Sequence, residues 1–88
     1  MTQRRILIVD DDDSLRRVTQ VQLTQAGYQV LTAASGEDAS AMLERTPVDM
    51  VITDLQMPGK SGLDLLREIQ AEYPETPVLM ITAFGTVE

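Results

Sequence analysis

Four short apolar runs recur along this chain, and they constrain its fold more than any other feature of the sequence. They are Ile6–Val9, Tyr28–Ala33, Met50–Thr53 and Val78–Ile81. The first, third and fourth are rich in aliphatic residues and lack polar alternation, which is typical of strands that are buried on both faces. The sequence therefore predicts four strands, most of them in the middle of a sheet rather than at a wet surface.

The segments between these runs carry apolar residues at the 3.6-residue spacing of helices. A helix is predicted to begin at Ser14 and to end before Gly27, because glycine commonly follows the last helical residue. Ser35 and Ser61 predict the starts of two more helices, since an acidic residue follows each serine three positions later. A further helix is expected to begin within residues 83–88. The resulting order, βαβαβαβ, predicts a parallel sheet with helices on both faces.

The size and composition of the chain indicate one small globular domain spanning residues 1–88. The chain has 88 residues, 43% of them apolar, which is enough for a packed core. No apolar run approaches the roughly 18 residues of a membrane span, and the start lacks the pattern of a signal peptide. Cysteine is absent, so disulfides and thiolate chemistry are excluded. We therefore expect a cytoplasmic protein without membrane contact.

The negative charge is concentrated at two points of the sequence. The net charge is −7, and five of the 14 acidic residues are Asp10 to Asp13 and Asp54. Without these five, nine acids face seven bases, so the rest of the chain is close to neutral. This distribution favours a bound cation over nucleic acid, which would require a basic stripe. The pairs Arg4–Arg5 and Arg16–Arg17 are expected to be solvated.

Polar residues follow three of the four predicted strands. Asp10 and Asp11 come directly after the first, Asp54 after the third and Thr82 after the fourth. In an open parallel sheet, ligands bind beyond the carboxyl ends of the strands. These four residues are therefore expected to converge at one edge of the sheet, although they are far apart in sequence.

Carboxylates gathered in this way repel one another unless some are protonated or a cation neutralises them. A group of carboxylates without histidine or cysteine suits Mg²⁺, which prefers oxygen ligands and is often completed by a phosphate oxygen. The ligand spacing of a calcium loop and the preferred ligands of zinc are both missing. Asp54 beside such an ion could attack phosphorus, and Thr82 could then hydrogen-bond a phosphoryl oxygen.

At these positions the sequence resembles the receiver domains of two-component response regulators. The strings Ile8–Asp12, Thr53–Gly59 and Ile81–Ala83 are similar to the three signatures of that family in the correct order, and Gly62 fits the same pattern. The resemblance covers all 88 residues. In detail it is similar to receivers of enhancer-binding regulators.

The resemblance implies a flavodoxin-like, doubly wound α/β fold with the strand order 2-1-3-4. It also implies a phosphoacceptor rather than an enzyme, which takes a phosphoryl group from a sensor histidine kinase with the help of Mg²⁺. Phosphorylation would then switch the interactions of the domain with partners such as a downstream effector domain.

The residues to which the resemblance assigns a role lie in the loops after the first, third and fourth strands. Asp54 would be the phosphoacceptor, and Mg²⁺ would be bound by Asp54, by Asp11 directly or Asp10 through water, and by the backbone carbonyl of Gln56. Thr82 and Ala83 would form the switch that binds the phosphoryl group. Met57 and Pro58 would shape the loop after Asp54.

The sequence departs from the family pattern at its C-terminal end. It lacks the fifth strand, the fifth helix and the lysine that pairs with the phosphoryl group, so the receiver domain is expected to be incomplete there. Lys60 lies in a different loop and is expected to be solvated. Without a fifth strand, Val78–Ile81 would be an exposed edge, which predicts self-association through this strand.

Other functions remain open on the sequence alone. A protein-interaction module that is not phosphorylated could use the same scaffold. A flavin or nucleotide site is disfavoured, because aspartates follow the first strand where such a site offers glycine and backbone N–H groups. A hydrolase that uses an aspartyl phosphate is disfavoured because Gln56 occupies the place of its second acid.

Overall fold

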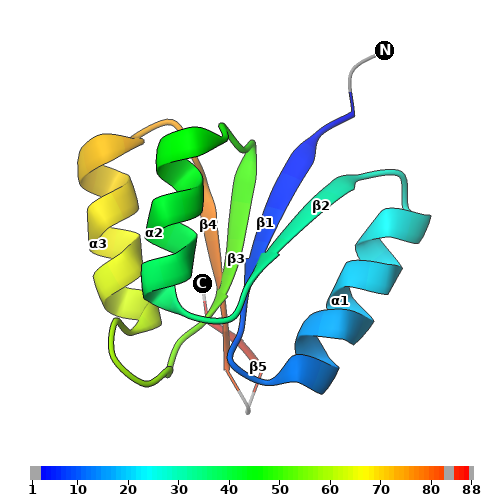
Figure 1. Ribbon diagram of the computed structural model, residues 1–88, viewed down its shortest axis with the longest axis horizontal. Coiled ribbons are helices and arrows are strands. Elements are labelled where there is room, and N and C mark those ends of the chain that lie inside the picture. The colour runs from blue at the N-terminus through cyan, green and yellow to red at the C-terminus, as the bar shows by residue number, and fades with distance from the viewer. Residues whose placement is uncertain (1–2, 83–84, 88) are drawn as a thin grey trace.

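A five-stranded sheet with the order β2-β1-β3-β4-β5 forms the middle layer of the molecule (Figure 1). The computed structural model describes residues 3–82 and 85–87, and of Thr82 and residues 85–87 it describes the backbone. The strands are β1 (Arg5–Val9), β2 (Gln29–Ala33), β3 (Met50–Asp54), β4 (Val78–Thr82) and β5 (Gly85–Val87). Strands β1 to β4 are parallel and have the predicted order, so their carboxyl ends point the same way.

Strand β5 differs from what the sequence led us to expect. Residues 85–87 form a short strand instead of the start of a helix, and this strand runs antiparallel to β4. It pairs with Met80, Ile81 and Thr82, so the prediction that Val78–Ile81 is an open edge is wrong at Met80 and Ile81. The expectation of self-association through β4 loses its basis there. The parallel fifth strand and the following helix of a full receiver are not found among the described residues.

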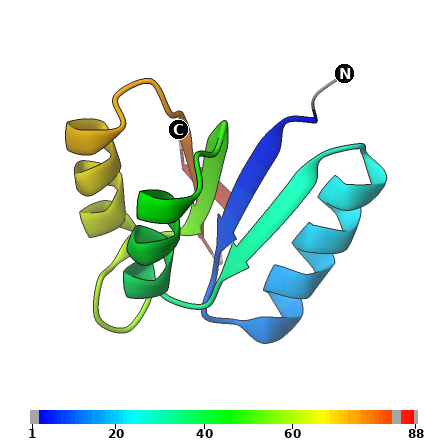
Figure 2. The same ribbon diagram turned by 45° about the horizontal axis from the view of Figure 1, so that its top comes forward.

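Within residues 3–82 and 85–87, three helices cover both faces of the sheet (Figure 2). Helix α1 (Asp13–Gln25) lies alone on one face, and α2 (Gly36–Arg45) and α3 (Gly62–Glu72) lie on the other. Alternate residues of β1 therefore point into two separate cores. Leu7 and Val9 belong to the larger core, and Ile6 and Ile8 to the smaller one beside α1.

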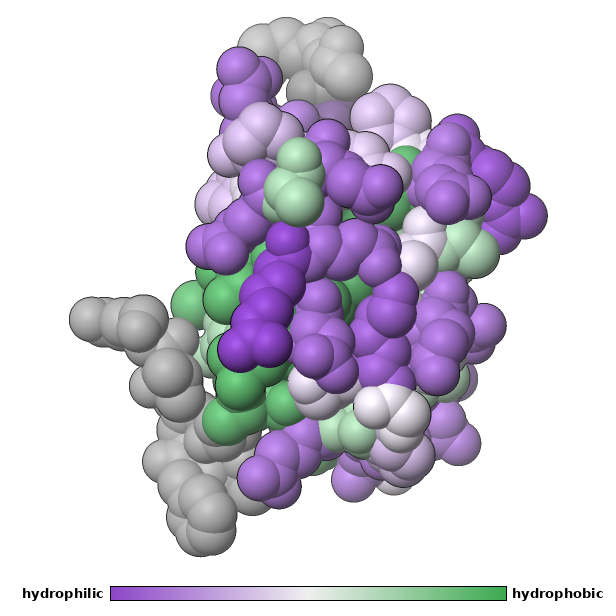
Figure 3. Space-filling model, turned by 90° about the vertical axis from the view of Figure 1, so that its left-hand side faces the viewer, coloured by the Kyte–Doolittle hydropathy of each residue, from purple (hydrophilic) through white to green (hydrophobic). Residues whose placement is uncertain are grey.

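The larger core lies between the sheet and the helix pair α2 and α3. It is closed by apolar residues at helical spacing, which leaves the outer surface on the α3 side largely hydrophilic (Figure 3). Burial of this apolar surface provides most of the driving force for folding. The buried members of this core are Leu7, Val9, Ala33, Ala39, Leu43, Val51, Met57, Leu65 and Ile69.

Helix α1 is packed less completely than the other two helices. It has no buried residue, and Leu15, Val18 and Val21 are 58%, 53% and 46% exposed. The smaller core contains Ile6, Ile8 and Ile52, with Leu23 of α1 packed against it. The two faces of the sheet are thus covered unequally.

The helix ends follow local sequence signals. Ser35 and Ser61 accept hydrogen bonds from the N–H groups of Asp38 and Asp64, as predicted, and Ser61 and Asp64 form a reciprocal capping box. The first helix begins one residue earlier than predicted, because Asp12 is its cap. Gly27 follows this helix with φ +103°, a conformation that favours glycine. Within the described part of the chain, we find no helix with the length and apolar character of a membrane span.

Candidate functional site

Three aspartates from the ends of β1 and β3 come together at the carboxyl end of the sheet. One carboxylate oxygen from each of Asp10, Asp11 and Asp54 lies within 4.8 Å of the other two. Asp10 directly follows β1, and Asp54 is the last residue of β3, the neighbouring parallel strand. Asp10 and Asp54 are half-buried, and Asp11 is exposed. The topology alone predicts this convergence, and the structure has it.

The loop between β1 and α1 is held by contacts to its own backbone. The N–H of Asp12 donates a hydrogen bond of 2.9 Å to Oδ1 of Asp10. Arg16 donates from Nη1 to the backbone carbonyl of Asp10 at 2.8 Å, and its Nη2 forms an ion pair with Asp13. The side chain of Arg16 is only 20% exposed, so the prediction of a solvated arginine is wrong at this position. Arg16 fixes the loop that carries Asp10 and Asp11.

The loop between β3 and α3 begins at Asp54 and packs closely against the helix that follows. The N–H of Gln56 donates to Oδ1 of Asp54 at 3.4 Å. Met57 is buried in the larger core, whereas Gln56 and Pro58 are exposed. At Gly62, a Cβ atom would lie 2.1 Å from the backbone carbonyl oxygen of Asp54. Glycine is therefore required where α3 begins against the end of β3.

Thr53 contributes a buried hydroxyl that the sequence does not distinguish from the apolar run around it. Its side chain is fully buried, and the hydroxyl donates to the carbonyl oxygen of Asp54 at 3.1 Å. Because a buried polar group is costly without a partner, this bond secures the backbone at the end of β3. Threonine is common in strands, so the sequence carries no separate signal for this role.

Of the two predicted switch residues, Thr82 and Ala83, the structure describes only the backbone of Thr82. Thr82 ends β4, and β4 is paired with β3, so the backbone of Thr82 lies at the same edge of the sheet as Asp54. Ala83 lies outside the described residues. The expected roles of Thr82 and Ala83 in binding a phosphoryl group stay predictions.

Within the cluster, Asp10 has a pKa above its ordinary value. Partial burial raises the pKa of Asp10, and the charges of Asp54, Asp11 and Asp12 act in the same direction, against the hydrogen bond from Asp12. A raised pKa means that the folded chain disfavours the ionised form of Asp10. The three carboxylates are thus a set of hard oxygen donors whose repulsion a cation would relieve, and this chemistry fits Mg²⁺.

We predict that Asp10→Asn stabilises the metal-free protein. The folded-state pKa of this acid is raised, so its ionisation opposes folding as the pH rises through that pKa. The gain at neutral pH should be about 0.5 kcal/mol, because a group that still meets solvent is screened. Urea unfolding in EDTA measures it, and the advantage of the variant should shrink at acidic pH. A destabilised variant would contradict this account of the cluster.

The matched control for this prediction is Asp38→Asn on the exposed first turn of α2. It removes the same charge away from the cluster and should not stabilise the protein, because acids at helix N-termini are favourable. When Mg²⁺ is added, the wild type should become more stable than Asp10→Asn, since the wild type keeps the full set of carboxylates.

Comparison with known proteins agrees with the architecture of the chain. The family model of the response regulator receiver domain matches residues 6–88. The response regulator protein PilR of Pseudomonas aeruginosa is 38% identical over 88 residues, which are 100% of this chain and 20% of PilR. The transcriptional regulatory protein GlrR of Escherichia coli is 43% identical over 82 residues, 93% of this chain and 18% of GlrR. The chain thus spans about a fifth of the length of these curated relatives.

Solved structures share the fold closely. The response regulator TrrA of Thermotoga maritima, in complex with Mg²⁺-BeF, superposes with a TM-score of 0.89 at 36% identity, over 92% of this chain and 70% of that one. A complex of the histidine kinase ThkA with TrrA matches with a TM-score of 0.88 at 35% identity, over 94% of this chain and 72% of that one. The matched family, the parallel sheet and the strand order lead to one conclusion: this chain belongs to the response regulator receiver domain family.

Proposed function

We propose that this chain is a phosphoacceptor in two-component signalling and that Asp54 receives the phosphoryl group. The observation that carries the proposal is the meeting of Asp10, Asp11 and Asp54, each with an oxygen within 4.8 Å of the others. Such a cluster has no structural need in a small domain, since its charges repel one another. The cluster therefore disfavours a module that only binds other proteins.

The proposed donor is a phosphohistidine of a sensor kinase, the class of partner bound to TrrA in the matched complex. An oxygen of the Asp54 carboxylate forms a bond to phosphorus while the phosphorus–nitrogen bond breaks. The electron pair stays on the imidazole nitrogen, which takes up a proton from solvent. The products are an acyl phosphate on Asp54 and a free histidine, so the domain acts as a regulated substrate rather than as an enzyme with turnover.

We further propose that Asp10, Asp11, Asp54 and the backbone carbonyl of Gln56 hold Mg²⁺. When bound, the ion would offset the negative charge of the incoming phosphoryl group. Arg16 supports this set by fixing the carbonyl of Asp10, and the N–H of Gln56 keeps the carboxylate of Asp54 oriented. Thr82 and Ala83 would hydrogen-bond the phosphoryl oxygens, and Met57 and Pro58 shape the loop between Asp54 and α3.

We propose that residues 1–88 form the receiver domain of a cytoplasmic regulator and that an effector domain is its downstream partner. Curated relatives such as GlrR are transcriptional regulators about five times the length of this chain. The proposed output is a phosphorylation-dependent change in the surface that such a partner contacts. Direct contact with nucleic acid is not proposed for this segment, since its charge is negative.

The test is phosphorylation by a small donor. We expect that incubation with acetyl phosphate and Mg²⁺ adds one phosphoryl group to the chain, as measured by intact-protein mass spectrometry. Hydroxylamine should remove the group, because it cleaves acyl phosphates and leaves phosphoserine and phosphothreonine intact. EDTA should prevent the reaction, since without a cation the three carboxylates repel the donor.

Two results would count against this proposal. A chain that stays unmodified in Mg²⁺ would not be a phosphoacceptor under these conditions. Equal labelling in EDTA would separate the reaction from the cation and remove the proposed role of the carboxylate cluster.

A further inference from the structure

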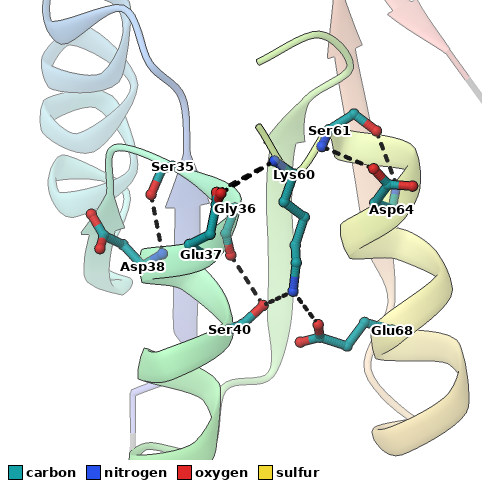
Figure 4. A network of polar contacts seen from close by, with 9 residues as sticks. All are labelled: Ser35, Gly36, Glu37, Asp38, Ser40, Lys60, Ser61, Asp64 and Glu68. Atoms are coloured by element: carbon teal, nitrogen blue, oxygen red, sulfur yellow. Dashed lines mark hydrogen bonds and ion pairs between the residues drawn. The ribbon is translucent and has the colours of Figure 1, made fainter. Parts of the chain in front are cut away.

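Lys60 lies between α2 and α3, and its side chain joins the two helices (Figure 4). It is the single lysine of the sequence. Its ammonium donates to Oγ of Ser40 on α2 at 2.8 Å and to the carboxylate of Glu68 on α3. Lys60 and Glu68 are only 28% and 24% exposed, so the prediction that Lys60 is solvated is wrong. The hydroxyl of Ser40 in turn donates to the carbonyl of Gly36, which completes the connection to the start of α2.

The backbone of Lys60 is in equally close contact with α2. Its N–H lies 3.4 Å from both carboxylate oxygens of Glu37. A Cβ atom at Gly36 would approach the carbonyl oxygen of Lys60 to 2.6 Å, and one at Gly59 would approach Glu37 to the same distance. The end of this loop therefore has no room to slide along α2, and any shift would break the contacts of Lys60.

The loop that Lys60 fixes is the loop that leaves Asp54. Its first residue is bonded to β4, where the N–H of Leu55 donates to the carbonyl of Ile81 at 2.9 Å. Gln56, the proposed carbonyl ligand, follows directly, and its N–H is bonded to Asp54. Between these points and α3, the buried Met57 and the contacts of Lys60 hold the loop against the helices. A short segment, anchored by the buried Met57, thus connects Lys60 to the end of β3 and to Asp54.

We propose that Lys60 is a positioning residue for the cation site: by joining Ser40 and Glu68 it holds residues 55–61 in place and thereby raises the affinity of the cluster for Mg²⁺. This inference rests on the proposed function for the identity of the ligand. Removing the ammonium would leave Glu68 partly buried without its cation, and α3 and the loop would have to adjust. Supporting residues around a metal site commonly contribute about tenfold or more to its affinity.

The sign of the effect distinguishes positioning from simple electrostatics. Lys60 carries a positive charge, so its removal should strengthen cation binding if charge alone mattered. Positioning predicts the opposite. We expect Lys60→Met to weaken Mg²⁺ binding about tenfold, as measured by calorimetric titration. Arg67→Met on α3 is the matched control, because it removes the same charge at an exposed residue outside these contacts, and its affinity should be unchanged or slightly higher.

A second readout follows from the single lysine. In protein labelled with ¹³C at lysine, the side chain gives one set of lysine signals, and we expect these signals to shift as Mg²⁺ is added. A shift supports the connection between the loop and the site, and signals that do not respond across a titration that saturates the site overturn it. Ser40→Ala provides a charge-neutral variant that removes one partner of the ammonium, and it too should weaken Mg²⁺ binding.

The outcomes separate this inference from the proposed function. If the wild type binds Mg²⁺ and Lys60→Met binds it as tightly or more tightly, the positioning role is wrong and the cation site stands. If the wild type does not bind Mg²⁺, both the cation site and the positioning role of Lys60 are wrong. If Lys60→Met does not fold, which urea unfolding reports, Ser40→Ala decides: weaker binding supports the role and unchanged binding overturns it.

Discussion

Replacing Asp54 by asparagine is expected to abolish phosphorylation by acetyl phosphate. The amide keeps the shape of the side chain and the acceptor for the N–H of Gln56, but it removes the nucleophilic carboxylate. The phosphoryl mass seen with the wild type should fall to background. Because the cluster also loses one of its three charges, Mg²⁺ binding should weaken in the same variant.

Asp12→Asn is the matched control for this experiment. Asp12 belongs to the same acidic run, but its side chain caps α1 by accepting from the N–H of Leu15. Asparagine caps helices about as well, so the fold should be kept. This variant should still be phosphorylated. Persistent labelling of Asp54→Asn would place the phosphoryl group on another residue and refute the assignment of Asp54.

Gly62→Ala is expected to destabilise the protein by about 3 kcal/mol, the upper end of the usual cost of overpacking. The new Cβ would meet the carbonyl oxygen of Asp54 at 2.1 Å and backbone atoms of Asp54 and Leu55 at 3.0 Å. Backbone atoms cannot avoid the new Cβ by adopting another rotamer, as a flexible side chain can. Either α3 or the end of β3 must therefore move. Urea unfolding measures the loss, and the rate of phosphorylation by acetyl phosphate should fall because Asp54 is displaced.

Gly27→Ala separates this steric effect from backbone strain. Gly27 has φ +103°, but a Cβ there would meet nothing within 4 Å. Its cost should be about 1 kcal/mol, from the conformation alone, and phosphorylation should be unaffected because Gly27 lies at the opposite end of α1 from the aspartates. Equal losses of stability and activity in the two variants would argue against the contact at Gly62.

The sheet and the meeting of the aspartates could be predicted because each depends on a strong local pattern and one general rule. Ile6–Val9 and Met50–Thr53 have the composition of buried strands, and helical segments between them leave only a parallel arrangement. Once the strands are parallel, residues that follow them must lie at the same edge. Asp10, Asp11 and Asp54 were therefore placed correctly without knowledge of any side-chain contact.

The roles of Arg16 and Lys60 could not be predicted in this way. Both are long, flexible side chains, and the partners they reach depend on the packing of elements rather than on sequence spacing. Arg16 bonds to a carbonyl six residues earlier, and Lys60 contacts residues 20 positions before it and eight after it. Their sequence context is that of ordinary surface charges, which is why both were expected to be solvated.

The prediction of a helix within residues 83–88 is wrong over residues 85–87 for a different reason. Residues 83–88 are too few to show a helical or alternating pattern, so local sequence could not decide between helix and strand. Residues 85–87 form a strand because the unpaired N–H and C=O groups at the edge of β4 are a template for another strand. Residues 85–87 pair with Met80–Thr82 and take up part of that edge.

The unequal covering of the sheet has a consequence for the order in which parts of the molecule open. Helix α1 contributes no buried residue, so it should unfold locally at a lower free energy than α2 or α3. The loop that carries Asp10 and Asp11 is tied to α1 through Asp12 and Arg16, whereas Asp54 belongs to the more stable half. A cation that joins the two halves would therefore suppress the opening of α1. Occupancy of the site would raise the free energy of local unfolding over the whole length of that helix.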